Sequence, residues 1–209
     1  MNTSQLPAAD IVFFGIQGSG KGTQAAYFVE NYGYEYCATG SYLRKLVREN
    51  SHPEALRIGE LLQAGHLVPD ELIFEIFQDY LNADPEKRIV FDGFPRTMSQ
   101  FQRFEDIYKR AGKTYVAVYF ELSLTQALNR ISHRIELVSG KEEKRNDDKD
   151  MNIIAARFTS FYTHTFPVVA ELLKEERMIF VNAEQSPDAI HQDVLKEFAA
   201  LEKSKQTVS

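Results

Sequence analysis

The sequence predicts an α/β fold in which a five-stranded parallel β-sheet is covered by helices on both faces. Five short apolar runs alternate along the chain with segments of helical periodicity; they cover residues 11–14, 34–38, 88–91, 115–122 and 178–182. Parallel strands buried on both faces read as continuous apolar runs, and their alternation with helices is typical of this fold class. The length of 209 residues suits one domain, residues 1–209.

The first apolar run leads directly into a glycine-rich stretch, residues 15–23, which reads GIQGSGKGT and has the spacing G-x-x-x-x-G-K. Glycines allow a tight turn in which backbone N–H groups converge on an anion at the start of the next helix. Lys21 is placed to reach the terminal phosphates of a nucleotide. The usual pattern continues with Ser or Thr, whereas here Gly22 precedes Thr23. Glycines that only fix a bend would not explain the accompanying lysine and hydroxyl, so the stretch predicts a phosphate site.

The helices are expected in the segments between the strands. Thr39 should be the N-cap of a helix that His52-Pro53 ends, and Pro167 should interrupt the helix over residues 153–174. Gly65 and Pro69 should separate two further helices. The other helices are expected over residues 21–31, 54–64, 70–81, 97–111, 124–133 and 187–201. Residues 138–149 are polar and read as a surface excursion, and residues 202–209 as a frayed end.

Composition excludes several classes of protein. A formal net charge of −6 argues against a nucleic-acid partner, which would require a basic patch. The single cysteine, Cys37, allows no intrachain disulfide and fits a reducing compartment. The first ten residues lack the features of a signal peptide, and no apolar run has membrane-spanning length. We therefore expect a cytoplasmic protein with no membrane partner.

Two stretches, residues 39–68 and 133–148, fall outside the simple alternation of strands and helices. In an open α/β sheet the ligand lies beyond the carboxyl ends of the strands. Insertions at that edge are well placed to close over it.

Several motifs resemble those of adenylate kinases and occur in the same order. They are GSGKGTQ (residues 18–24), TGSYLR (39–44), AGHLVPDEL (64–72), DGFPRTMSQ (92–100), RISHR (130–134) and RNDD (145–148), followed by Arg157. The resemblance runs from about residue 10 to beyond residue 182. It implies a P-loop NTPase-type three-layer fold with its core in residues 10–38, 69–132 and 149–203. Residues 39–68 would be a small helical insertion that binds the nucleoside monophosphate, and residues 133–148 a short lid.

The resemblance also implies a function and a set of site residues. The protein would be a monomer that catalyses ATP + AMP = 2 ADP with Mg²⁺. The ATP site would comprise Gly18, Ser19, Gly20, Lys21, Gly22, Thr23 and Arg130. The AMP site would comprise Thr39, Arg44, His66, Leu67, Val68, Gly93, Phe94, Arg96 and Gln100. Lys21, Arg96, Arg130, Arg134, Arg145 and Arg157 would be catalytic. Asp92 would orient water on the magnesium ion, and the Phe94–Pro95 peptide would be cis.

Elementary chemistry agrees with that reading. Phosphoryl transfer between nucleotides needs charge neutralisation, alignment and exclusion of water, which several arginines provide. It needs no general base, because an acceptor phosphate with a second pKa near ~6 is largely dianionic at neutral pH. The five histidines show no metal-ligand spacing and residues 133–148 contain no cysteine, so we expect no structural zinc.

Departures from the family pattern keep alternatives open. Gln17 stands where the family usually has proline, and Ser41 where it nearly always has an aspartate that helps to hold magnesium-bound water. Ser41 leaves open a nucleotide-binding regulator that has lost turnover. A UMP or CMP kinase is the other alternative, although relatives of that kind usually carry alanine and asparagine in place of Thr39 and Gln100. The donor, ATP or GTP, is not decided. Asp147 and Asp148 could pair with lid arginines or only solubilise a loop.

Overall fold

The structure is a computed structural model, and it describes residues 6–81, 86–134, 136–138, 141–143 and 148–208. Five parallel strands form the main sheet: β1 (Asp10–Phe14), β2 (Glu35–Ala38), β3 (Ile89–Asp92), β4 (Tyr115–Glu121) and β7 (Met178–Asn182). Their spatial order is β2-β3-β1-β4-β7, so the chain crosses over between neighbouring strands. The predicted fold class is confirmed, and each predicted strand lies within two residues of its expected position.

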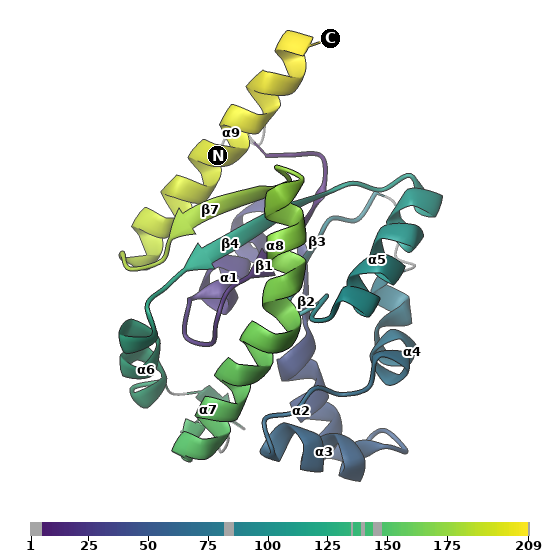
Figure 1. Ribbon diagram of the computed structural model, residues 1–209, viewed down its shortest axis with the longest axis vertical. Coiled ribbons are helices and arrows are strands. Elements are labelled where there is room, and N and C mark those ends of the chain that lie inside the picture. Colours follow the sequence, from purple (N-terminus) through teal and green to yellow (C-terminus); the bar gives the residue numbers. More distant parts are fainter. Residues whose placement is uncertain (1–5, 82–85, 135, 139–140, 144–147, 209) are drawn as a thin grey trace.

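Helices pack on both faces of this sheet, and the strand residues alternate between them (Figure 1). Val12, Phe14 and Phe91 face the core shared with α4 (Asp70–Leu81), α5 (Met98–Ala111) and α8 (Phe166–Lys174). Ile11 and Phe13 face the core shared with α1 (Lys21–Tyr32), α6 (Leu124–Ser132) and α9 (Pro187–Val208). The molecule therefore has three layers, and the carboxyl ends of all five strands meet at one edge.

Two smaller units extend beyond that edge. The first contains α2 (Thr39–Glu49) and α3 (Ala55–Gln63), which lie beside each other at the lower end of Figure 1. The second is an antiparallel hairpin of β5 (Glu136–Val138) and β6 (Lys141–Glu143), within the stretch that reads from the sequence only as a polar excursion. In the described part of the chain, no helix is long and apolar enough to cross a membrane.

The structure corrects three expectations about the helices. Thr39 is the first residue of α2 and not its N-cap, which is Ala38; no side chain caps this helix. The helix around Pro167 is not broken there. Instead α7 (Met151–Ser160) passes through a π-helical turn (Phe161–Thr165) into α8. The wider turn accommodates the proline, which has no N–H and would clash with the carbonyl four residues earlier in a regular helix.

The last correction concerns the end of the chain. Residues 202–208 continue α9 instead of fraying. This segment is rich in Glu, Lys and Gln, which are good helix formers, and they extend the helix beyond its buried part.

Candidate active site

A pocket of about 590 Å³ lies at the carboxyl edge of the sheet, between the glycine-rich loop and the start of α2. Six cationic side chains line it: Lys21, Arg44, Arg96, Arg130, Arg134 and Arg157. Among the described lining residues, Asp92 is the one acidic side chain. A chain of net charge −6 thus concentrates positive charge in one hollow, which suits a ligand with several phosphates.

Lys21 is held inside the loop at the start of α1. Its ammonium donates to the carbonyls of Gly15 (2.8 Å) and Ile16 (3.1 Å) and to Ser19 Oγ (3.3 Å). Burial lowers the pKa of Lys21 to about 8; Asp92 opposes the shift, and Arg96 is the first of three arginines that add to it. The loop bends at Gly18 and Gly20, which both have positive φ, and leads directly into the N-terminus of α1. This arrangement is the one expected for a phosphate-binding loop.

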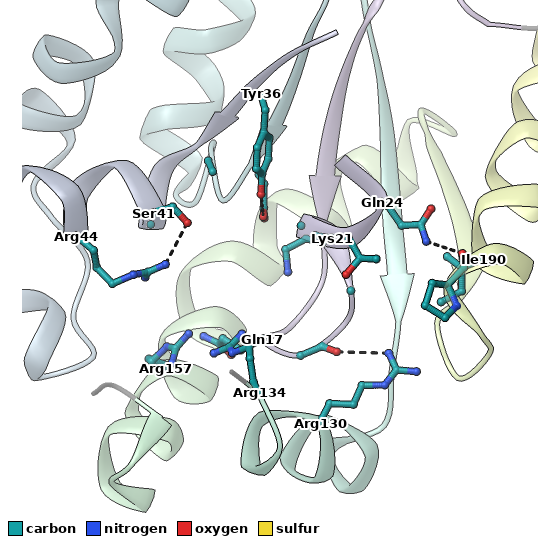
Figure 2. A pocket seen from close by; sticks show the side chains of 18 of the residues that line it. Gln17, Lys21, Gln24, Tyr36, Ser41, Arg44, Arg130, Arg134, Arg157 and Ile190 are labelled. Carbon is teal, nitrogen blue, oxygen red and sulfur yellow. Dashed lines mark hydrogen bonds between the residues drawn. The ribbon is translucent and has the colours of Figure 1, made fainter. Parts of the chain in front are cut away.

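Arg130 ties the loop to the end of β7. From α6 it donates to the carbonyls of Gly18 (3.4 Å), Ala183 (2.7 Å) and Gln185 (3.4 Å). Figure 2 shows its guanidinium below the loop, on the side of the pocket near Ile190. The planar group is therefore fixed at the wall of the pocket.

Two further arginines share one buried carboxylate. Arg134 donates to Asp148 through Nε (2.7 Å) and Nη2 (2.6 Å to Oδ1), and Arg157 donates through Nη1 (2.9 Å). The Asp148 side chain is fully buried. The sequence left two alternatives open for Asp148, pairing with arginines or only solubilising a loop. The structure shows that it pairs with arginines. The cluster keeps a net positive charge and orients both guanidinium groups at the pocket.

Arg96 is held by the backbone around it. Its N–H donates to Gln100 Oε1 (2.7 Å), its Nε donates to the Gly93 carbonyl (2.7 Å), and its carbonyl accepts from Thr165 Oγ1 (3.0 Å). The Phe94–Pro95 peptide just before it is cis, as expected. Arg96 lines the main pocket and two smaller hollows beside it, of about 110 and 20 Å³. It therefore marks the junction between the loop and the α2–α3 unit.

The smallest of these hollows gathers most of the residues predicted for the acceptor. It is lined by Thr39, His66, Leu67, Val68, Gly93, Arg96 and Gln100. Thr39 Oγ1 is buried and has no hydrogen-bond partner in the described structure. The Gln100 amide is fully oriented, because Oε1 accepts from Arg96 and Nε2 donates to Asp70 Oδ1 (2.7 Å). The hollow thus offers polar atoms with fixed directions between apolar walls.

Asp92 ends β3 and accepts a hydrogen bond from the Tyr36 hydroxyl (2.9 Å to Oδ2). The Thr23, Tyr36 and Ser41 hydroxyls line the same pocket. One carboxylate with several neutral oxygens is the donor set expected for Mg²⁺, which keeps most of its own waters. Asp70 is committed elsewhere, since it accepts from Gln100 and Thr97. No group of three or more His, Cys, Asp or Glu side chains suited to a metal occurs in the described ranges.

Most of the predicted site residues meet in this cleft, with three exceptions. Ser19 is fully buried under the loop, where it accepts a hydrogen bond from Lys21, and it does not line the pocket. The Phe94 ring lies in the core against Phe74 and Phe104 and does not line the cleft. Arg145 lies outside the described residues, as does Asp147. The sequence analysis missed Tyr36, Gln185, Pro187 and Ile190, which also line the pocket. Gln185, Pro187 and Ile190 follow the end of β7, which was the available signal for them, because ligands in open α/β sheets lie at that edge.

The fold and the site together define a class of enzyme, the phosphotransferases that hold a nucleotide with a glycine-rich loop at the edge of a parallel sheet. Comparison with known proteins identifies the family within that class. A family model described as adenylate kinase matches residues 13–177. The chain belongs to the adenylate kinase family.

Individual relatives are similar over nearly their whole length. Adenylate kinase isoenzyme 1 of Homo sapiens is 32% identical over 200 residues, which cover 94% of this chain and 98% of that protein. Adenylate kinase of Phocaeicola vulgatus is 32% identical over 197 residues (93% and 98%). Adenylate kinase of Chlamydia pneumoniae is 29% identical over 204 residues (88% and 95%).

Proposed function

We propose that this protein catalyses the reversible transfer of the terminal phosphoryl group of ATP to AMP, with Mg²⁺, to give two ADP. One observation carries the choice of acceptor. A buried, unpartnered Thr39 hydroxyl and a Gln100 amide of fixed orientation share a narrow hollow that opens at Arg96.

This hollow suits adenine. With its orientation fixed, the Gln100 amide keeps one N–H and one oxygen lone pair for a ligand. Adenine presents a donor, the N6 amine, next to an acceptor, N1, and one amide can satisfy both. Leu67 and Val68 supply apolar walls for the faces of the base. Uracil, whose N3–H lies between two carbonyls, does not present this pair. Cytosine does present it, but its single ring would fill less of the space between the apolar walls than a purine.

The phosphate of AMP would lie at Arg96 and Arg44, where the three hollows meet. Its dianion attacks the terminal phosphorus of ATP; a P–O bond forms to the acceptor and the bond to the β-phosphate oxygen breaks, which releases ADP. No protein base is needed. Lys21, with Arg134 and Arg157 beside the path, would stabilise charge that spreads over the transferred group.

Asp92 would hold a magnesium ion through water, and the ion would supply positive charge that neutralises the donor's phosphates. Lys21 must leave its bonds with the loop carbonyls to follow these phosphates. The loop N–H groups and Arg130 would hold the donor meanwhile. The planar guanidinium of Arg130, held at the pocket by three carbonyls, would also stack on the donor base.

We also propose that the protein works as a cytoplasmic monomer. Six cationic side chains of this chain line the main pocket, which is enough to balance the charge of a nucleotide without residues from a second chain. Cys37 is a buried free thiol, which suits a reducing compartment.

A coupled assay of ADP formation tests the proposal. Purified protein and Mg²⁺ are supplied with ATP or GTP and one acceptor from the set AMP, GMP, CMP and UMP. We expect AMP with ATP to give the highest kcat/KM. Faster turnover of UMP or CMP would instead assign a pyrimidine nucleotide kinase. Nucleotide binding without magnesium-dependent turnover of any pair would indicate a regulator.

A further inference from the structure

Tyr36 is an unexpected member of the site. It reaches from β2 into the pocket, and Figure 2 shows its ring pointing down between Ser41 and Lys21. Its hydroxyl donates to Asp92 Oδ2 at 2.9 Å. In the register of the sheet Ala38 is opposite Asp92, so Tyr36 precedes that position by two residues on the same face of β2. The bond therefore crosses diagonally from one strand to the next and fixes the carboxylate.

The glycine-rich loop leaves room for this hydroxyl. A Cβ atom on Gly22 would lie 3.3 Å from Tyr36 Oη, which is tighter than ordinary contact. Gly22 stands where the usual loop pattern has Ser or Thr, whose hydroxyl binds magnesium. At this place the structure brings up a hydroxyl from the opposite side, on Tyr36.

Ser41 does little to replace the missing acid of the family pattern. It is exposed, and its Oγ accepts from Arg44 Nη2 at 3.2 Å. Asp92 is left as the one carboxylate among the described residues of the pocket. Its orientation then depends on Tyr36.

We propose that Tyr36 is a positioning residue for the magnesium ion. Its hydroxyl holds Oδ2 of Asp92, which leaves Oδ1 to accept from water on the ion. In this way Tyr36 compensates for the serine at position 41. This inference rests on the proposed function, and it concerns how this chain, with Ser41, retains a magnesium site. The Tyr36 oxygen keeps lone pairs that can accept from the same waters.

The test measures binding as well as turnover. The Kd of ATP is determined by titration calorimetry without AMP, once with EDTA and once with saturating Mg²⁺. The Kd with EDTA divided by the Kd with Mg²⁺ reports how strongly the protein favours the metal complex of ATP. A change that affects all nucleotide binding equally cancels in this ratio. We expect Tyr36→Phe to lower this ratio about fivefold, the size of one ordinary hydrogen bond. The free Mg²⁺ needed for half-maximal turnover should rise in parallel.

Tyr34→Phe is the matched control. Tyr34 lies two residues earlier in the chain, and its buried hydroxyl donates to the carbonyls of Pro7 and Ala9, away from the pocket. Tyr34→Phe therefore also removes one buried hydroxyl. We expect it to change thermal stability and leave the Kd ratio within twofold of the unmodified protein. A folded Tyr36→Phe protein with an unchanged ratio would overturn the proposal, as would an equal loss in Tyr34→Phe.

Ser41→Asp supplies a second, independent arm. If Tyr36 compensates for Ser41, Ser41→Asp should raise the Kd ratio more in the Tyr36→Phe protein than in the protein that retains Tyr36. Ser41→Asn, which adds no charge, should not raise the ratio in either protein. Equal gains in both backgrounds would contradict compensation. Failure of the proposed function would look different, because the unmodified protein would then form no ADP from ATP and AMP.

Discussion

Lys21 is expected to form hydrogen bonds with the loop when the site is empty and with phosphate when a nucleotide is bound. In the structure its three donors are used by the loop itself, at Gly15, Ile16 and Ser19. These bonds stabilise the loop in the shape that receives phosphate. A nucleotide must exchange them for phosphate oxygens, which carry more charge and bind the ammonium more strongly.

We predict that Lys21→Met lowers kcat by two or more decades, about 3 kcal/mol of transition-state stabilisation, with the fold intact. Methionine keeps an unbranched side chain that is one atom shorter, and it removes the charge. Steady-state kinetics measures the loss, and circular dichroism checks the fold. Lys174→Met, at an exposed position on α8, is the control and should retain full activity. Near-normal turnover in folded Lys21→Met would remove Lys21 from the mechanism.

The pKa of Lys21 predicts proton uptake on binding. With a pKa of about 8, part of the Lys21 population is neutral at pH 8. Phosphate oxygens nearby favour the charged form and raise the pKa, so the complex binds more protons than the protein alone. Affinity for ATP should therefore fall as the pH rises from 7 to 9. Calorimetry at pH 8 in two buffers of different ionisation enthalpy measures the uptake, which Lys21→Met should abolish; equal heats in both buffers would contradict it.

Among individual residues, the sequence predicted the roles that depend on a local motif better than the roles that depend on a partner far away in the chain. Lys21 and Arg96 lie inside motifs whose spacing fixes their direction. Asp148 could not be assigned, because its partner Arg134 lies 14 residues away and the choice depends on burial. Tyr36 looked like part of an ordinary strand. Its role depends on Asp92, which is 56 residues distant.

Among the elements, the π-helical turn between α7 and α8 has a direct connection to the site. Its last residue, Thr165, is nearly buried and donates to the Arg96 carbonyl at 3.0 Å. Arg96 itself follows β3, on a different segment of the core. The turn thus supports the arginine that we assign to the acceptor phosphate, and π-helical turns often occur at functional sites.

Thr165→Val should weaken that support without a change of volume. We predict a fall of about fivefold in kcat/KM for AMP, the size of one hydrogen bond, and little change in KM for ATP. Thr165→Ser keeps the hydroxyl and should stay close to the unmodified protein. Equal increases in the KM values of both nucleotides, or a Thr165→Ser protein as impaired as Thr165→Val, would show only a general loss of packing.

The same element shows where sequence patterns stop. Apolar runs predicted all five strands because burial on both faces leaves a strong signal. Pro167 predicted a break, since a proline lacks the N–H of a regular helix. Whether the chain breaks or widens into a π turn depends on tertiary packing, here of Phe161 and Val168 in the two cores. The hairpin of β5 and β6 had no apolar run to reveal it.

For the whole molecule, the α2–α3 unit already touches the opposite side of the cleft. A Cβ atom on Gly65 would lie 3.0 Å from Ala156 Cβ and 3.3 Å from Arg157 Cγ, both in α7. Only a glycine allows this approach. The contact brings the acceptor hollow next to the arginine cluster, as transfer without loss of phosphate to water requires.

We predict that a bisubstrate analogue, two adenosines joined by a phosphate chain, makes the protein more compact. The radius of gyration from solution X-ray scattering should fall on binding. Gly65→Ala should keep the α2–α3 unit further from α7, so the radius of the bound protein should stay larger than that of the unmodified complex, because the added methyl group meets α7. Gly112→Ala is the control: its φ of +64° is close to the +73° of Gly65, but nothing lies within 4 Å. An unchanged radius in the unmodified protein, with binding confirmed, would argue against closure.

The parallel sheet also determines where the chain can be attached to other materials. All strands run toward the active edge, so residues 6–9 enter β1 at the opposite edge. The 22-residue helix α9 follows β7 and runs back about 33 Å, and Figure 1 shows the far end of α9 and the segment that leads into β1 away from α2, α3 and α7. Immobilisation on a bead or an electrode through either terminus would therefore leave the nucleotide cleft facing the solution, with its moving parts unhindered.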